Sequence, residues 1–174
     1  MQNNWYTVYT RSHCERKVSL SLTRKNIENY CPVIHKKYRQ LFRNTILNEP
    51  LFKSYVFVKT SEEEIYKLSK EVNGVISCLF WKGKPATIKE EEINAIKDFT
   101  KYHEEISVEK MHVSNGNVDS GISYLMEGQI LLIKNRTMQL TLPSLGLRMV
   151  AKCEELGIMG REISFGNKDL ISQS

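Results

Sequence analysis

Two short segments near the start of the chain constrain its fold most, because each is dense in aromatic and β-branched residues. Residues 5–11 read Trp-Tyr-Thr-Val-Tyr-Thr-Arg, and residues 49–58 read Glu-Pro-Leu-Phe-Lys-Ser-Tyr-Val-Phe-Val. Such side chains pack well on a pleated, half-buried surface, so both segments predict strands. The chain is therefore expected to build a sheet from its first third.

Helical periodicity appears between and after these strands. One helix is predicted over residues 13–26, and two more are indicated by capping boxes that begin at Ser61 and Thr87 and end at Glu64 and Glu90. An apolar residue recurs every third or fourth position in each helix, as on the buried side of a surface helix. The three apolar stripes are Cys14, Val18 and Leu22; Ile65, Leu68 and Val72; and Ile93, Ile96 and Phe99.

The remaining segments of the first hundred residues complete an α+β pattern. Residues 30–34 are rich in strand formers and precede a basic run, and a turn near Arg43 and Asn44 would close a hairpin. Residues 75–81 predict another strand, and residues 82–85 a turn. The element order is β-α-β-β-β-α-β-α. It indicates an α+β fold, in which helices flank a mainly antiparallel, ferredoxin-like sheet.

Composition excludes several classes of protein. The four cysteines, Cys14, Cys31, Cys78 and Cys153, include no Cys-x-x-Cys pair, so buried thiols are expected rather than disulfides or a metal site. No phosphate-binding loop or nucleophile motif occurs, and we expect no enzymatic activity, catalytic residue or cofactor. No apolar run approaches the roughly 18 residues that cross a bilayer. The N-terminus lacks a signal-peptide pattern, which indicates a cytoplasmic protein without membrane contact.

The net charge of +5 is unevenly distributed. Residues 1–59 hold eleven lysines and arginines against three glutamates, whereas residues 60–105 hold seven against ten acidic residues. A concentrated positive face predicts a phosphate-bearing partner such as nucleic acid. Ordinary solvated lysines are the alternative.

Composition changes after Tyr102. The polar, turn-rich stretch that follows indicates a linker, and short strands are predicted over residues 129–134, 137–142 and 147–153. Several short strands in about 45 residues indicate a small barrel. The predicted segments are an N-terminal domain (1–103), a linker (104–118), a β-barrel (119–155) and a flexible tail (156–174).

The two opening segments resemble the N-terminal domain of the NusG family, transcription elongation factors that ride on RNA polymerase. The family pattern is a Trp-Tyr strand, a charged helix and Pro-Leu-Phe-Pro-x-Tyr-Val-Phe-Val, with Lys53 here in place of the second proline. Gly121, then Glu127 and Gly128 leading into residues 129–133, are similar to the SH3-like KOW barrel of the family. Residues 142–152 look more like specialised paralogues found beside surface-polysaccharide operons than like general NusG.

The resemblance implies three sets of site residues. An aromatic pocket for the coiled-coil tip of the polymerase clamp would comprise Tyr9, Phe52, Tyr55 and Phe57, with core packing as the alternative. Cations facing non-template or upstream DNA would be Arg11, His13, Arg16, Lys17, Arg24 and Lys25, with a solvated helix face as the alternative. Weaker candidates for contact with the opposite pincer of the polymerase are Ser61, Glu62 and Glu63, and helix capping also accounts for these residues.

The implied function is transcription elongation or antitermination. A monomeric factor would hold the clamp closed and suppress pausing or termination, on a dedicated polysaccharide operon, while the KOW domain recruits a ribosomal protein. The alternatives are a housekeeping NusG and an RNA- or ribosome-binding KOW protein that acts without polymerase. Residues 137–142 alternate at period two, and Pro143 would interrupt a helix. The KOW segment is therefore expected to be a β-barrel rather than a helical hairpin that masks the aromatic pocket.

Overall fold

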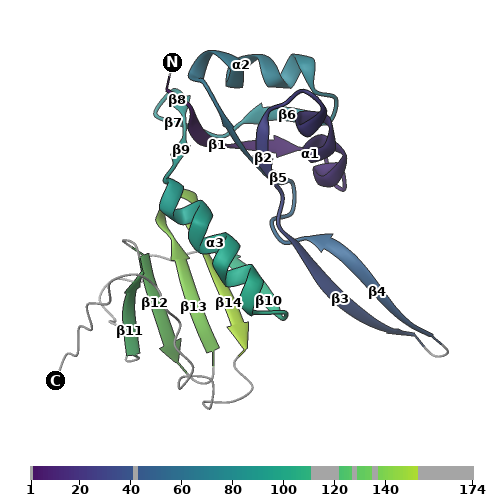
Figure 1. The fold of residues 1–174 in the computed structure, drawn as a ribbon, viewed down its shortest axis with the longest axis vertical. Coiled ribbons are helices and arrows are strands. Elements are labelled where there is room, and N and C mark those ends of the chain that lie inside the picture. Colours follow the sequence, from purple (N-terminus) through teal and green to yellow (C-terminus); the bar gives the residue numbers. More distant parts are fainter. Residues whose placement is uncertain (1, 41–42, 111–121, 127–128, 135–136, 153–174) are drawn as a thin grey trace. The chain divides into compact units, whose positions relative to one another are not determined.

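The computed structural model describes residues 2–40, 43–110, 122–126, 129–134 and 137–152. Two compact units, Met1–Ile93 and Asn94–Ser174, are described separately below. Most elements of the first unit appear in Figure 1. They are β1 (Asn4–Thr10), α1 (Glu15–Arg24), β2 (Glu28–Tyr30), β3 (Val33–Gln40), β4 (Arg43–Pro50), β5 (Tyr55–Thr60), α2 (Glu62–Glu71), β6 (Val75–Cys78), β7 (Phe80–Trp81), β8 (Lys84–Pro85) and β9 (Thr87–Ile88).

Strand β1 is the centre of the first sheet. The strand order is β2-β5-β1-β6, with β9 also paired to β1, and all pairings are antiparallel. The two segments that constrain the fold most are thus neighbours, with Trp5 opposite Lys59 and Tyr9 opposite Tyr55. The α+β class and the antiparallel sheet are confirmed.

Helices α1 and α2 cover one face of this sheet. The buried Val18 and Leu22 of α1 lie on the predicted stripe, as do Ile65 and Leu68 of α2, because a helix buries positions three and four apart. Glu15 of α1 is also buried, although it lies outside the predicted stripe. Ser61 caps α2 as predicted, and its side chain accepts a hydrogen bond from the backbone N–H of Glu64 at 3.3 Å. The shared core comprises Tyr6, Val8, Val18, Leu22, Val56, Val58, Ile65, Leu68, Val72, Val75 and Cys78.

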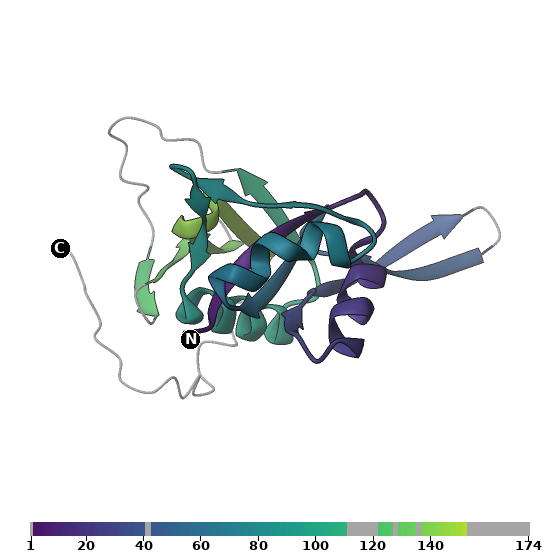
Figure 2. The same ribbon diagram turned by 90° about the horizontal axis from the view of Figure 1, so that it is seen from above.

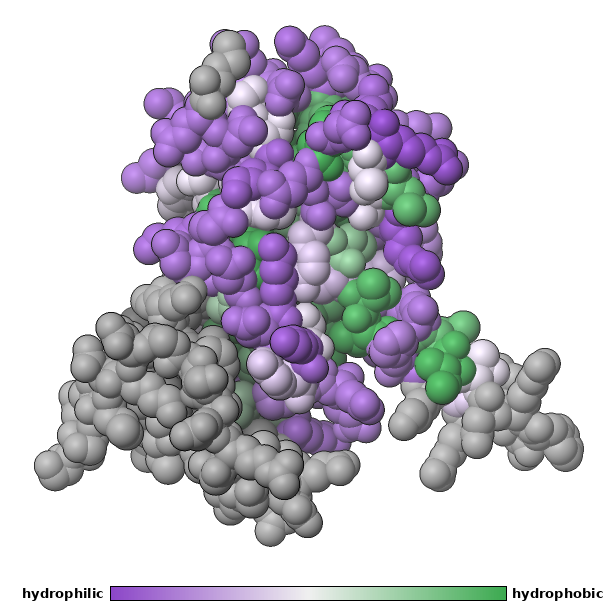
Figure 3. All heavy atoms as spheres, in the orientation of Figure 1, coloured by the Kyte–Doolittle hydropathy of each residue, from purple (hydrophilic) through white to green (hydrophobic). Residues whose placement is uncertain are grey.

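Strands β3 and β4 form a separate two-stranded ribbon that projects from the rest of the first unit in both views (Figures 1 and 2). The expected hairpin is present, but its turn was expected too late in the sequence. Gln40 pairs with Arg43, so Arg43 and Asn44 belong to β4 rather than to the turn. Hydrophobic atoms are visible at the surface of this hairpin (Figure 3), where Val33, Tyr38, Ile46 and Leu47 are exposed.

Two further expectations about the first unit are corrected. The strand expected over residues 75–81 is interrupted at Leu79, whose backbone N–H donates to the carbonyl of Thr7 at 2.9 Å, and β7 then pairs with β8. Thr87 was expected to cap the third helix but lies in β9, opposite Tyr6. Helix α3 (Glu90–Tyr102) begins three residues later, after Lys89. Pairing with β1 outweighs the local capping signal.

The second unit contains residues 94–102 of α3 and a five-stranded antiparallel sheet. Its strands are β10 (Ile106–Lys110), β11 (Ile122–Met126), β12 (Gln129–Lys134), β13 (Thr137–Leu142) and β14 (Leu147–Lys152), in the order β10-β14-β13-β12-β11. A 3₁₀ turn, η1 (Pro143–Leu145), joins β13 to β14. The predicted strands over residues 129–142 pair as a hairpin. The expected tail and most of the expected linker lie outside the described residues, but β10 falls within the linker range and pairs with β14.

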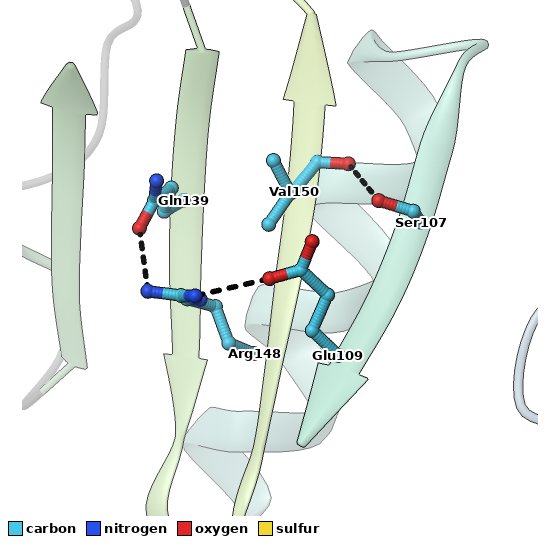
Figure 4. A network of polar contacts seen from close by, with 5 residues as sticks. All are labelled: Ser107, Glu109, Gln139, Arg148 and Val150. Carbon is cyan, nitrogen blue, oxygen red and sulfur yellow. Dashed lines mark hydrogen bonds and ion pairs between the residues drawn. The ribbon is translucent and has the colours of Figure 1, made fainter. Parts of the chain in front are cut away.

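The two faces of the second sheet differ in polarity. Leu140, Leu142 and Met149 are fully buried on one face. On the other, Arg148 donates to Gln139 at 3.1 Å and pairs with Glu109 at 3.0 Å, while Ser107 donates to the carbonyl of Val150 (Figure 4). At the end of α3, His103 packs on Phe99, and its Nε2 lies 3.2 Å from the sulfur of Met138. Burial lowers the pKa of His103, which favours the neutral ring in this contact.

Candidate partner-binding surfaces

Two of the four predicted aromatic residues form a partly exposed pair on the sheet. Tyr9 of β1 and Tyr55 of β5 are directly opposite in the register, with ring centroids 5.7 Å apart and an interplanar angle of 57°. Tyr9 is 41% exposed, and Tyr55 is half-buried. Cross-strand aromatic pairs stabilise a sheet, and here the pair is also partly accessible at the surface.

The other two aromatic residues are buried beside this pair, because Phe57 follows Tyr55 by two residues on the same face of β5. Phe52 and Phe57 are 2% and 0% exposed, and their rings meet edge to face at 5.2 Å. Tyr30 of β2 stacks on Phe57 with centroids 6.3 Å apart. Phe52 and Phe57 can therefore support a binding surface without forming its outer layer, whereas Tyr9 and Tyr55 are accessible.

A buried carboxylate holds the turn that carries these aromatic residues. Glu15, in the first turn of α1, is 4% exposed, and its Oε1 accepts a hydrogen bond from the backbone N–H of Ser54 at 2.7 Å. Ser54 has φ of 63°, and its carbonyl accepts from the backbone N–H of Thr10 at 2.8 Å. The left-handed backbone of a non-glycine residue is costly unless its surroundings hold it. Glu15 therefore positions the turn immediately before Tyr55. No sequence signal distinguished it from the polar residues around it.

The six predicted DNA-facing cations are all exposed: Arg11, His13, Arg16, Lys17, Arg24 and Lys25. They extend over the whole of α1, a distance of about 15 Å for a ten-residue helix. Arg16, Lys17 and Arg24 lie on the side of α1 opposite the buried Val18 and Leu22. The loop before α1 is anchored, because the backbone N–H of Arg11 donates to the carbonyl of Gly74 at 2.9 Å. The exposed cations therefore form a positive surface on α1 and on the anchored loop that precedes it.

The basic hairpin is partly neutralised. Lys36 pairs with Glu49 at 3.1 Å, and the Tyr38 hydroxyl also donates to Glu49. The hydrogen bond from Tyr38 and the nearby Lys36 lower the pKa of Glu49, and the same hydrogen bond raises the pKa of Tyr38. The side chains of Lys37, Arg39 and Arg43 lie outside the described residues.

The predicted second polymerase contact is divided between buried and exposed residues. Ser61 is buried and engaged as the helix cap, whereas Glu62 and Glu63 are exposed in the first turn of α2. Glu64 bonds to the Thr60 hydroxyl, and this hydrogen bond lowers the pKa of its carboxyl group. Of the three predicted residues, Glu62 and Glu63 have side chains that are accessible at the surface.

Sequence reasoning missed three exposed aromatic residues, one in α2 and two in β7. Tyr66, Phe80 and Trp81 are 47%, 47% and 71% exposed, and the rings of Tyr66 and Phe80 lie 5.9 Å apart. The residues at 80–84 were interpreted as the end of a strand followed by a turn. An aromatic pair that directly precedes a two-residue turn was the available signal.

The described residues offer little for chemical catalysis. Burial raises the pKa of the thiols of Cys31 and Cys78 to about 11, so both are protonated at neutral pH rather than nucleophilic thiolates. Among these residues no group of three metal-ligating side chains is gathered. Nor does any helix in the described part have the length and apolar character to cross a membrane.

Comparison with known proteins identifies a relationship over the first unit. The family model described as "Transcription termination factor nusG" matches residues 3–97. A Thermotoga maritima NusG structure that concerns domain interaction is similar with 19% identity and a TM-score of 0.46, covering 87% of this chain and 93% of that chain. A chain of the MjSpt4:Spt5 complex in conformation A shows 16% identity and a TM-score of 0.31, with coverages of 85% and 99%. No curated protein matches the chain.

Proposed function

The chain belongs to the NusG family, whose model spans more than half of its 174 residues, and from this premise we propose that it binds RNA polymerase as an elongation and antitermination factor. The observation that carries this proposal is the partly exposed Tyr9–Tyr55 pair. It supplies the accessible aromatic surface that a clamp coiled coil would require. A housekeeping NusG and a specialised polysaccharide-operon factor share this proposed surface.

The tyrosine pair has the properties of an interface hot spot. Tyrosine offers a large apolar ring with few rotatable bonds and a hydroxyl that can remain hydrated. The rings stand on adjacent central strands, and the buried Phe52 and Phe57 pack against each other beside them. A rigid surface loses little conformational entropy on binding.

The exposed cations of α1 would act on DNA near the transcription bubble. Phosphate contacts from Arg16, Lys17 and their neighbours would orient the factor without reading sequence. The proposed mechanism is mechanical, because a factor that binds the closed clamp more tightly than the open clamp shifts the polymerase toward the closed state. We further propose a cytoplasmic monomer whose second unit recruits a ribosomal protein.

Tyr55→Ala tests the proposal. Truncation is expected to weaken binding of the full chain to polymerase by about 1–3 kcal/mol, as for a hot-spot aromatic. Tyr66→Ala is the control, because Tyr66 is a tyrosine on α2 of the same unit and is more exposed than Tyr55. Affinity is measured with purified polymerase, and readthrough is measured in single-round transcription across a terminator. Wild-type affinity in a folded Tyr55→Ala protein would refute the assignment, as would co-purification of the wild-type chain with ribosomes but not with polymerase.

A further inference from the structure

The β7–β8 hairpin carries an exposed tryptophan that the fold does not use. Trp81 is 71% exposed, in contrast with Trp5, which is 2% exposed. Tryptophan usually buries most of its large surface, and exposed aromatic groups frequently mark binding sites. Packing therefore does not account for Trp81.

The exposure of Trp81 does not result from a loosely attached loop. The two turn residues Lys82 and Gly83 have φ of 50° and 80°, as in the tight type I′ turns that match the twist of a hairpin. The hairpin base is tied to β1, because Leu79 donates to the Thr7 carbonyl at 2.9 Å and accepts from the N–H of Ala86 at 2.8 Å. Phe80 contacts Tyr66 of α2. Successive strand residues point to opposite faces, so Trp81 lies on the face away from Phe80.

The residues next to Trp81 within the hairpin carry positive charge. Lys84 is directly opposite Trp81 in the strand pair, and Lys82 is the next residue in the turn. Both lysines are exposed, and residues 72–89 contain three lysines and no acidic residue. An aromatic ring flanked by ammonium groups matches the two chemical parts of a nucleotide, because the ring stacks on the base and the cations neutralise phosphates.

The hairpin is linked through β6 to the loop before α1, which carries part of the surface already proposed to face DNA. The chain leaves Gly74, which holds the backbone of Arg11, and reaches Trp81 seven residues later along the β6 edge. At the rise per residue of an extended strand, the distance from Gly74 to Trp81 is at most about 23 Å, which several nucleotides can span. Neither Trp81 nor the lysine ammonium groups offer a hydrogen-bond acceptor that would select a ribose hydroxyl.

We propose that Trp81, Lys82 and Lys84 form a stacking platform for single-stranded DNA. In a transcribing complex the available strand is the displaced non-template strand, so the biological setting rests on the proposed function. The binding itself is a property of the free protein. Its failure is therefore distinguishable from failure of polymerase binding.

Fluorescence anisotropy of the full chain with labelled oligothymidylate tests the platform. Trp81→Ala is expected to weaken binding about tenfold, which is typical for loss of one stacked base, while Trp81→Phe should retain near wild-type affinity. Tyr102→Ala is the matched control, because Tyr102 is 62% exposed with Lys101 over its ring at 5.4 Å. A folded Trp81→Ala protein with wild-type affinity would overturn the proposal, as would equal losses in the two alanine variants.

Two further measurements identify the ligand. Saturating oligothymidylate should quench tryptophan emission of the wild type but not of Trp81→Phe, in which Trp5 is the remaining tryptophan. Replacing Lys82 and Lys84 with alanine should reduce the slope of log affinity against log salt by about 1.4, for two phosphates on a single strand. Binding that depends on Trp81 for oligouridylate or duplex but not for oligothymidylate would overturn the DNA assignment. If Trp81→Ala lost polymerase binding while its oligonucleotide binding stayed unchanged, the DNA assignment would also be overturned, and Trp81 would be a protein contact.

Discussion

Replacing Glu15 with alanine is expected to destabilise the first unit by about 2–4 kcal/mol. The carboxylate accepts a 2.7 Å hydrogen bond from the N–H of Ser54 while only 4% of the residue is exposed. A hydrogen bond to a charged group contributes about 1.5–3 kcal/mol, and the change also leaves a buried N–H without its acceptor. A carboxylate in the first turn of a helix adds about 0.3–1 kcal/mol through the helix dipole.

Two further variants separate these contributions. Glu15→Gln keeps a carbonyl acceptor and nearly the same volume, so about half of the loss is expected, because neutral hydrogen bonds are roughly half as strong as charge-assisted ones. Glu62→Ala is the matched control. Glu62 is the first residue of α2, as Glu15 is of α1, but its side chain is exposed. It should lose only the dipole contribution, about 0.3–1 kcal/mol.

Urea unfolding measures these differences. In a Trp81→Phe background the buried Trp5 reports on the first unit, and the midpoint and slope together give the free energy of unfolding. Amide exchange at Ser54 should accelerate in Glu15→Ala, because its hydrogen-bond acceptor is gone. If Glu15→Ala and Glu62→Ala cost the same within about 0.5 kcal/mol, the buried hydrogen bond does not hold the turn and the reasoning fails.

Three other outcomes are expected. Gly74→Ala should destabilise the first unit by more than about 1 kcal/mol, because Gly74 has φ of +101° and an added Cβ would lie 3.0 Å from a methyl group of Val18. Gly83→Ala has strain but open space and should cost less, as urea unfolding of both variants would show. Tyr38→Phe should raise the pKa of Glu49 toward its ordinary value in an NMR titration. Because the pKa of Glu49 is lowered in the folded protein, its interactions stabilise the hairpin at pH values above the ordinary carboxyl pKa, and this stabilisation is lost as the pH falls through the lowered pKa. An unchanged pKa of Glu49 in Tyr38→Phe would contradict the contact between the two side chains. Limited proteolysis should spare Ile106–Lys110, which the sequence assigned to a linker, and early cleavage within this strand would argue against its pairing with β14.

The sequence alone was sufficient for features that depend on local pattern. The stripes that include Val18, Leu22, Ile65 and Leu68 predicted the buried faces of α1 and α2, and the structure buries them. The Ser61 cap was equally predictable, because its signal lies within four residues. Strand-forming composition identified β1 and β5, and local resemblance to the NusG motif indicated the family.

Only the tertiary structure determined which side chains are buried and which segments pair, because both depend on contacts between segments distant in sequence. Alternation places Tyr55 and Phe57 on one side of β5, but only packing leaves Tyr55 partly accessible and Phe57 buried. Thr87 carries a good local capping signal, yet pairing with β1 assigns it to β9. Glu15 and Trp81 invert the usual preferences of their residue types, because a long-range hydrogen bond stabilises the buried carboxylate and a tight hairpin holds the indole in solvent. Periodicity determines which side chains share a face, whereas contacts between segments distant in sequence determine whether that face is covered.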